Sequence, residues 1–242
     1  MNISLTEPAG VLVKTTLVDF PGIVACSFFL PGCNLRCPYC YNTELAEGQL
    51  PKDSSTVSIE QLFNHLEKRK NVLRGITISG GEALLSSKLK TIIKKAKSLG
   101  YKVKLDTNGT LPNQLKEIIN SKETIPDFIA MDIKTSKEKY PELLPSSGNI
   151  NPFSKILESI EILKSFSNEK EFRTVMVPPL ISKNEIKSIA KILPSDSSWK
   201  FAQFRNDNCL NKSFCSIIPY SDKEVSELVL YAKTFIPGAE LR

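Results

Sequence analysis

The 242-residue sequence has few cysteines, a single histidine and no long apolar run, and each shortage excludes a class of protein. Six cysteines are far fewer than a disulfide-stabilised scaffold of this length would contain. No apolar run reaches the roughly eighteen residues that a membrane-spanning helix requires. Because the first residues lack a basic segment followed by an apolar one, we expect no secretory signal. We therefore expect reduced thiols in the cytoplasm, where clustered cysteines indicate metal binding or catalysis.

The positive charge is moderate and dispersed. The net charge is +6, and the lysines alternate with apolar residues at helical spacing, as in "KLKTIIKKAKSLGYKVK". A nucleic-acid-binding face would concentrate this charge and interleave it with aromatic residues. The pattern indicates solvated helix faces, so we do not expect a nucleic-acid partner.

Short apolar strands alternate with amphipathic helices along the chain. The predicted strands cover residues 23–30, 75–79, 102–106, 128–133, 172–177 and 199–204. The predicted helices cover residues 58–70, 87–99, 113–120, 152–166 and 182–193, and a last one opens at Ser221. Residues 47–57 and 136–151 read as loops. This alternation predicts an α/β fold with parallel strands and outer helices.

The number of units limits the architecture. Six β/α units are two fewer than the eight of a closed barrel. A partial (β/α)6 barrel and a flat doubly wound sheet both remain open at this point. Because no linker or repeat divides the chain, we expect one domain over residues 1–242.

Half of the cysteines lie in "GCNLRCPYCYN", directly after the first predicted strand. Ligands of parallel α/β domains gather at the carboxyl ends of the strands. Cys33, Cys37 and Cys40 can hold three corners of a 4Fe–4S cluster and leave one iron without a protein ligand. An ordinary 4Fe–4S electron carrier uses four cysteines, one for each iron. An iron without a protein ligand would therefore be a binding site for a substrate or cofactor.

Less specific interpretations of the thiols remain open. Cys209 or Cys215 could complete a four-ligand zinc or iron–sulfur site, although loop thiols are the more frequent case. Cys26 falls within an apolar strand and is expected in the core. His65 lies among charged helix residues and is expected to be exposed. Trp199 begins a strand and is expected to pack.

CxxxCxxC with an aromatic residue (Tyr39) before its last cysteine resembles the signature of radical S-adenosylmethionine (SAM) enzymes. "SGGEALL" after the second predicted strand is similar to the glycine–glycine–glutamate motif of that superfamily. The resemblance implies that SAM chelates the open iron. It places Gly80 and Gly81 against the methionine moiety, Glu82 at the SAM ammonium, and the backbone around Tyr39 at the adenine. Ala83 stands where the family more often has proline.

Further motifs resemble the proteins that activate glycyl-radical enzymes, especially the longer-form anaerobic ribonucleoside-triphosphate reductase activating proteins. These motifs are "TTLVDFPG", "FFLPGCNLRCPYCYN", "LDTNG", "MDIK", "FRTVMVP" and "FAQFR". The resemblance implies a SAM pocket lined by the following residues: Asp106, Thr107, Asn108, Asp132, Lys134 and Arg173. In relatives, the two aspartate positions and the threonine help hold a monovalent cation against the SAM carboxylate. Arg173 would pair with SAM or with the partner's peptide, or would be a surface residue at a strand end.

The implied function is that of a radical SAM oxidoreductase. A 4Fe–4S cluster, reduced by a flavodoxin- or ferredoxin-type donor, would cleave SAM to methionine and a 5′-deoxyadenosyl radical. The radical would take a hydrogen atom from a glycine of a partner enzyme, which we expect to be an anaerobic ribonucleoside-triphosphate reductase. Two alternatives remain: a small-molecule radical SAM enzyme similar to 7-carboxy-7-deazaguanine synthase, and a non-enzymatic iron–sulfur electron carrier.

Overall fold

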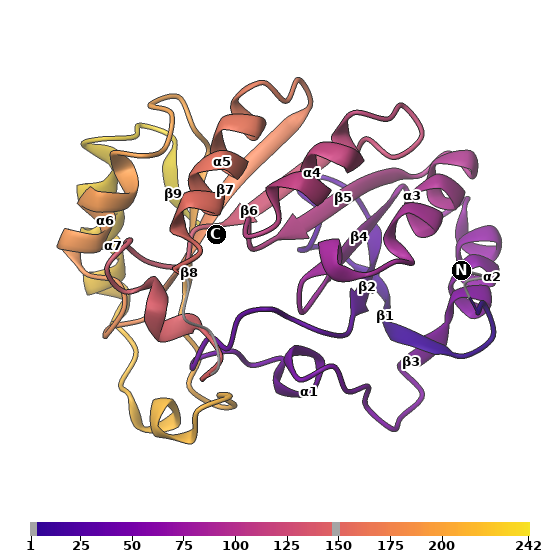
Figure 1. Ribbon diagram of the computed structural model, residues 1–242, viewed down its shortest axis with the longest axis horizontal. Helices are drawn as coiled ribbons and strands as arrows, with labels where there is room; N and C mark the ends of the chain where they lie inside the picture. Colours follow the sequence, from indigo (N-terminus) through magenta and orange to yellow (C-terminus); the bar gives the residue numbers. More distant parts are fainter. Residues whose placement is uncertain (1–3, 147–150) are drawn as a thin grey trace. The chain divides into compact units, whose positions relative to one another are not determined.

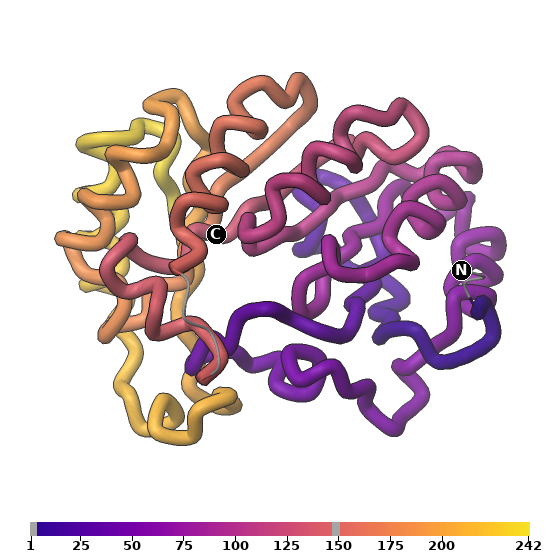
Figure 2. Tube along the Cα trace, viewed as in Figure 1, coloured from indigo at the N-terminus to yellow at the C-terminus, as the bar shows by residue number. Residues whose placement is uncertain are grey.

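A computed structural model describes residues 4–146 and 151–242 of the chain (Figures 1 and 2). The described residues form an α/β fold in which most strands run parallel. They divide into two compact units, and each unit is made of stretches that are not consecutive in the sequence. Unit 1 consists of Met1–Asn34, Glu44–Thr107 and Asn113–Ile129. Unit 2 consists of Leu35–Thr43, Asn108–Pro112 and Ala130–Arg242.

Unit 1 is built on five strands in the order β3-β1-β2-β4-β5. These strands are β1 (Pro8–Thr16), β2 (Ala25–Leu30), β3 (Thr56–Ser58), β4 (Gly75–Gly80) and β5 (Lys102–Thr107). The accompanying helices are α1 (Thr43–Ala46), α2 (Ile59–Arg69), the short η1 (Ala83–Leu85), α3 (Leu89–Ser98) and α4 (Pro112–Ile119). β2, β4 and β5 run parallel, whereas β1 is antiparallel to both β2 and β3. Ile76 and Ile78 of β4 have no exposed surface, as expected for a parallel strand covered on both faces.

Unit 2 is built on the strand order β6-β7-β8-β9. These strands are β6 (Phe128–Asp132), whose first two residues belong to unit 1, β7 (Glu169–Met176), β8 (Trp199–Gln203) and β9 (Ala239–Leu241). The helices are η2 (Tyr140–Leu143), α5 (Phe153–Lys164), α6 (Lys183–Ala190), η3 (Lys212–Ser216) and α7 (Asp222–Lys233). Figure 1 shows α6 and α7 side by side in orange and yellow, and their residues contact each other. Trp199 is fully buried and donates its indole N–H to Thr174 over 3.0 Å, which confirms its packing role.

Local sequence signals fix where the helices begin. α2, α6 and α7 each start with a reciprocal capping box, formed by Ser58 with Gln61, Ser182 with Glu185, and Ser221 with Glu224. In each pair the serine side chain accepts from a first-turn N–H, and the longer side chain accepts from the serine N–H. These are the helix starts that the sequence predicts. No helix in the described part of the chain combines the length and apolarity needed to cross a bilayer.

The structure confirms the predicted α/β fold with parallel strands and outer helices, and its sheet is open. Within the described residues, β3 pairs only with β1 and β9 only with β8. All six predicted strands are present, but β1, β3 and β9 were not predicted. β1 is an antiparallel addition at the amino end of the chain, which a repeating strand–helix pattern does not reveal.

Two smaller expectations were wrong in part. His65 is half-buried rather than exposed, and its Nε2 lies 3.1 Å from the Lys14 carbonyl oxygen. The predicted loop over residues 136–151 contains η2, and its residues 147–150 lie outside the described residues. Residues 47–57 are mainly loop, as predicted, and β3 begins at their end.

Burial of Cys26 makes stability depend on pH under alkaline conditions. Cys26 has no exposed surface, as predicted, and burial raises the pKa of its thiol from 9.0 to about 12. Between these values the unfolded chain has lost the thiol proton and the folded chain has kept it. The free energy of unfolding should therefore fall by up to about 1.4 kcal/mol per pH unit above about pH 9.

Urea unfolding of the reduced protein from about pH 8 to about pH 11 tests this dependence. The Cys26→Ala variant should be less stable at every pH, but its stability should fall less steeply with pH. Parallel pH profiles for the two proteins would show that Cys26 is not the titrating group.

Candidate active site

The loop from Cys37 to Cys40 forms a tight turn in unit 2. The Cys40 N–H donates to the Cys37 carbonyl oxygen over 3.0 Å, and Pro38 occupies the second position of the turn. Proline fixes the backbone angle that this position requires. The turn therefore carries a cysteine at each end, as a metal-binding knuckle does. Burial raises the pKa of the Cys40 thiol, while nearby N–H groups and the charges of Lys134 and Arg36 lower it.

A second loop of unit 2 supports this turn through its backbone. The Leu210 N–H donates to the Cys40 carbonyl oxygen over 3.0 Å, and the Asn211 N–H donates to the Pro38 carbonyl oxygen over 2.9 Å. Cys209 lies in this supporting loop, and Cys215 lies in η3, which follows it. Cys209 is fully buried, and burial together with its hydrogen bond to Cys215 raises the pKa of the Cys209 thiol to about 11.

Cys33 belongs to unit 1, where it follows Gly32 at the end of β2. Among the described residues, no three Cys, His, Asp or Glu side chains are gathered closely enough to hold a metal ion. Cys209 and Cys215 therefore do not form a ready-made site with Cys37 or Cys40. The assignment of Cys33, Cys37 and Cys40 as cluster ligands stays a prediction from the sequence.

The two glycines of "SGGE" are required by backbone packing within unit 1. A Cβ atom on Gly80 would lie 2.1 Å from the Leu30 carbonyl oxygen, and one on Gly81 would lie 2.1 Å from the Gly32 carbonyl oxygen. The Gly81 N–H donates to the Leu30 carbonyl oxygen over 2.9 Å, and the Glu82 N–H donates to that of Gly32 over 2.8 Å. The end of β4 thus lies directly against the segment that leads from β2 to Cys33.

Glu82 is buried in unit 1 and holds the start of η1. Its Oε1 accepts from the Leu84 N–H over 3.1 Å and from the Thr107 hydroxyl over 2.9 Å. Only 1% of Glu82 is exposed. Two predicted site residues are therefore in direct contact: Glu82, which follows β4, and Thr107, at the end of β5.

Asp106, next to Thr107 on β5, forms an ion pair with Lys104 on the same strand. The Lys104 side chain has no exposed surface, and its ammonium lies 5.8 Å from the centroid of the Phe128 ring. The sequence interpretation missed Lys104, because a lysine between apolar residues of a strand reads as a surface position. The one feature of the sequence that points to a role for Lys104 is its position directly before the "LDTNG" motif.

Unit 2 contains an ion triplet at the ends of β6 and β7. Arg173 Nε donates to Asp132 Oδ1 over 2.7 Å, and Lys134 Nζ donates to Asp132 Oδ2 over 2.9 Å. Burial alone would raise the pKa of Asp132, but the two cations outweigh it and hold that pKa well below its ordinary range. Burial would lower the pKa of Lys134, yet Asp132 raises it well above the usual value. All three groups are therefore charged at neutral pH.

Tyr39 provides a buried polar atom without a partner. Its hydroxyl group is buried and has no hydrogen-bond partner among the described residues, while its ring packs edge-on against Phe204 at 6.5 Å. Burial raises the pKa of Tyr39 well above its usual value, so the hydroxyl stays neutral. An unpaired buried hydroxyl costs free energy that a bound polar ligand would recover. This feature fits a ligand site beside the Cys37–Cys40 turn.

Asn108, the remaining predicted pocket residue, has a local role in unit 2. Its Oδ1 accepts from the Thr110 N–H over 3.0 Å and from the Thr110 hydroxyl over 2.6 Å. Only 4% of Asn108 is exposed. These bonds stabilise the turn that follows β5.

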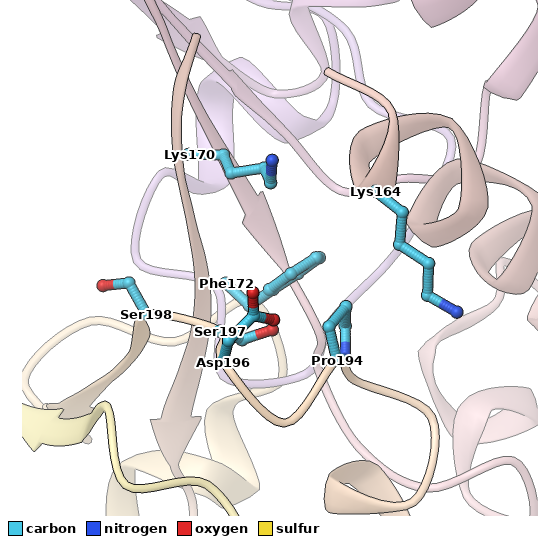
Figure 3. A pocket seen from close by; sticks show the side chains of 7 residues that line it. All are labelled: Lys164, Lys170, Phe172, Pro194, Asp196, Ser197 and Ser198. Atoms are coloured by element: carbon cyan, nitrogen blue, oxygen red, sulfur yellow. The ribbon is translucent and has the colours of Figure 1, made fainter. Parts of the chain in front are cut away.

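A separate cavity of about 470 Å³ lies in unit 2, at the start of β7 and just before β8 (Figure 3). It is lined by Lys164, Lys170, Phe172, Pro194, Asp196, Ser197 and Ser198. None of the predicted site residues lines this cavity. Because ligands of parallel α/β folds bind at the carboxyl ends of the strands, we do not assign catalysis to this cavity.

The family model for the radical SAM superfamily matches residues 27–193 of the chain. A Methanocaldococcus jannaschii protein, named as an inferred glycyl-radical enzyme activating enzyme, is 30% identical over 233 residues, covering 96% of this chain and 94% of the relative. The pyruvate formate-lyase-activating enzyme of Clostridium pasteurianum is 32% identical over 185 residues, covering 73% and 72%.

Solved structures share the fold at lower sequence identity. TYW1 with a lysine-pyruvate adduct bound gives a TM-score of 0.62 at 15% identity, covering 90% of this chain and 76% of that one. Streptococcus suis SuiB bound to S-adenosylmethionine gives a TM-score of 0.59 at 16% identity, covering 87% of this chain and 47% of that one. At these identities the likeness supports the fold alone.

The backbone contact at Gly81 gives a test of how this site is built. Gly81→Ala should lower the free energy of unfolding by about 3 kcal/mol or more, because the new methyl group meets the Gly32 backbone. It should also lower the iron content after anaerobic reconstitution, because the segment before Cys33 must shift. Urea unfolding and iron analysis measure the two effects.

Gly100→Ala is the matched control for this substitution. Gly100 has a φ of +84° and no atom within 4 Å of an added Cβ, so only backbone strain should act there. We expect a cost of about 1 kcal/mol and unchanged iron content. Equal effects of the two substitutions would contradict the packing role assigned to Gly81.

Proposed function

The chain belongs to the radical SAM superfamily, in its glycyl-radical-enzyme activating type, and we propose that its partner is an anaerobic ribonucleoside-triphosphate reductase. A relative named for glycyl-radical enzyme activation matches nearly the whole chain, and this observation carries the activating role. The motif series that begins with "TTLVDFPG" supports the reductase as the partner, because it resembles the longer-form activating proteins of that enzyme.

The cofactors are a 4Fe–4S cluster and SAM. A bound and reduced cluster would supply the electron for the reductive cleavage of SAM, and this cleavage would provide the radical chemistry that removes a hydrogen atom from the partner's glycine. In this proposal Cys33, Cys37 and Cys40 bind three irons and leave the fourth for SAM. The Pro38 turn and the backbone bonds of Leu210 and Asn211 hold two of these thiols in position.

The remaining residues bind and orient SAM in this proposal. Glu82 receives the SAM ammonium while Thr107 fixes the Glu82 carboxylate over 2.9 Å. The backbone at Tyr39 lies along the adenine. Asp106 lies toward the methionine end, and Lys134 and Arg173 border the same ligand, each already oriented by Asp132. These groups position the ligand and exclude water, which is the protein's share of radical chemistry.

We also propose a flavodoxin- or ferredoxin-type electron donor and a cytoplasmic location. Thiolate ligands require a reducing compartment, and a strongly reducing cluster requires a low-potential donor. A nucleic-acid partner is not part of this proposal, because the lysines are dispersed among apolar residues along the helices.

The central experiment is anaerobic activation of the reductase. The reconstituted protein, SAM, a chemical reductant and purified anaerobic ribonucleoside-triphosphate reductase should give the doublet of a glycyl radical by electron paramagnetic resonance. Cys37→Ala should abolish the signal because one cluster ligand is lost, whereas Cys215→Ala should retain it.

The other outcomes of this experiment separate the alternatives. A radical formed only on a different glycyl-radical enzyme would refute the reductase as partner but retain the activating role. SAM cleavage without a radical on any such enzyme, together with turnover of a small molecule, would favour the 7-carboxy-7-deazaguanine synthase type. A chain that binds a cluster but no SAM would be an electron carrier.

Two exposed apolar side chains of unit 2 are candidates for contact with the partner. Tyr41 directly follows the last cysteine of the loop and is 63% exposed, and Ile218 follows η3 and is 84% exposed. The Asn208 side-chain amide donates to the Tyr41 carbonyl oxygen over 3.0 Å, which links the cysteine loop to the segment that precedes η3. Buried aromatic and apolar anchors supply much of the energy of protein interfaces.

Tyr41→Ser combined with Ile218→Ser should therefore reduce the rate of glycyl-radical formation by about tenfold. The rate of SAM cleavage without the partner should stay the same. Leu230→Ser is the control, because Leu230 is 63% exposed on α7 and distant in sequence from the cysteine loop. An equal loss of glycyl-radical formation and of SAM cleavage would refute the contact. An equal effect of Leu230→Ser would refute it as well.

A further inference from the structure

Unit 1 contains a lysine ammonium at the position where a counter-ion for Asp106 is needed. Lys104 is fully buried on β5 and forms an ion pair with the Asp106 carboxylate two residues later. A buried charge is retained only where a partner compensates for the loss of water. The contact with the Phe128 ring adds a further favourable interaction for the ammonium. Asp106 therefore carries its own fixed cation.

In unit 2, the Asp132 carboxylate is likewise paired with cationic side chains. Lys134 and Arg173 bind the two carboxylate oxygens of Asp132 separately, over 2.9 and 2.7 Å. The side chains of both cations are only 16% exposed, and that of Asp132 is 26% exposed.

The ion pair at Asp106 does not fit a bound monovalent cation, although the family resemblance implies that Asp106 helps to hold one. A cation leaves water for a protein site when uncompensated negative charge attracts it. Here the Asp106 carboxylate is already paired with the buried Lys104 ammonium. A sodium or potassium ion bound at Asp106 would therefore lie next to an ammonium of the same charge, which repels it.

We infer that the Lys104 ammonium takes the place of the monovalent cation beside Asp106, so that SAM binding by this protein is independent of sodium and potassium. Lys104 is then a positioning residue, which acts on SAM through the orientation and charge of Asp106. The inference rests on SAM binding, which the family membership gives, and does not depend on the identity of the protein partner.

The test is SAM binding to the reconstituted, reduced protein without a partner enzyme. The affinity is measured by equilibrium dialysis, and the perturbation of the cluster's paramagnetic resonance signal by SAM provides a second readout. Sodium, potassium or tetramethylammonium chloride supplies a constant ionic strength of about 0.1 M. The dissociation constant of the wild-type protein should change by less than about twofold among the three salts.

Lys104→Met keeps the length of the side chain and removes its charge. This variant should bind SAM about tenfold more weakly in tetramethylammonium, and sodium or potassium should restore part of the affinity. Lys102→Met, an exposed position on the same strand, is the control and should behave like the wild-type protein. Lys104→Arg should retain the cation-independent binding.

Two results would overturn the inference. One is wild-type binding that tightens about tenfold or more on addition of sodium or potassium, which decides the matter even if Lys104→Met fails to fold. The other is a folded Lys104→Met variant whose binding remains as strong and as independent of the salt as that of the wild type. Because no glycyl-radical enzyme is present, neither result depends on the proposed partner.

Discussion

Close packing between two backbone segments of unit 1 determines how the candidate site is built. The end of β4 at Gly80 and Gly81 lies against Leu30 and Gly32, so closely that a methyl group on either glycine would overlap a carbonyl oxygen. Two hydrogen bonds of 2.8 and 2.9 Å connect the same segments. The residues that precede Cys33 are thereby fixed, and Glu82 is placed immediately beyond the contact. The glycine pair thus has a structural role that is independent of any ligand.

Internal charge compensation is the second organising feature. The acidic residues that end β5 and β6 are each paired with basic residues within their own unit, Asp106 with Lys104, and Asp132 with Lys134 and Arg173. Partly buried carboxylates would otherwise lose solvation without compensation. Lys134 and Arg173 hold the pKa of Asp132 well below its ordinary range, and the paired cations fix the orientation of both acids.

The sequence predicted the repeating part of the fold well and the exceptions poorly. Apolar strand segments, capping boxes and glycine stops placed the six main strands and most helices close to their observed bounds, because these signals are local. The antiparallel β1 was missed because no helix follows it, so it falls outside the repeating strand–helix pattern. Among the site residues, resemblance identified Asp132 and Arg173, but only the structure shows that they bind each other. Lys104 was missed because a lysine between apolar residues of a strand is usually a surface residue.

The central claim is that Cys33, Cys37 and Cys40 bind a 4Fe–4S cluster with one iron open to SAM. Electron–nuclear double resonance of the reduced cluster tests it directly, using SAM labelled with ¹⁵N in its amino group and ¹⁷O in its carboxylate. The account predicts hyperfine coupling of both labels to the cluster, since both groups bind the open iron. A cluster that shows no coupling in the presence of saturating SAM, and whose fourth iron is bound by a protein side chain, would contradict it.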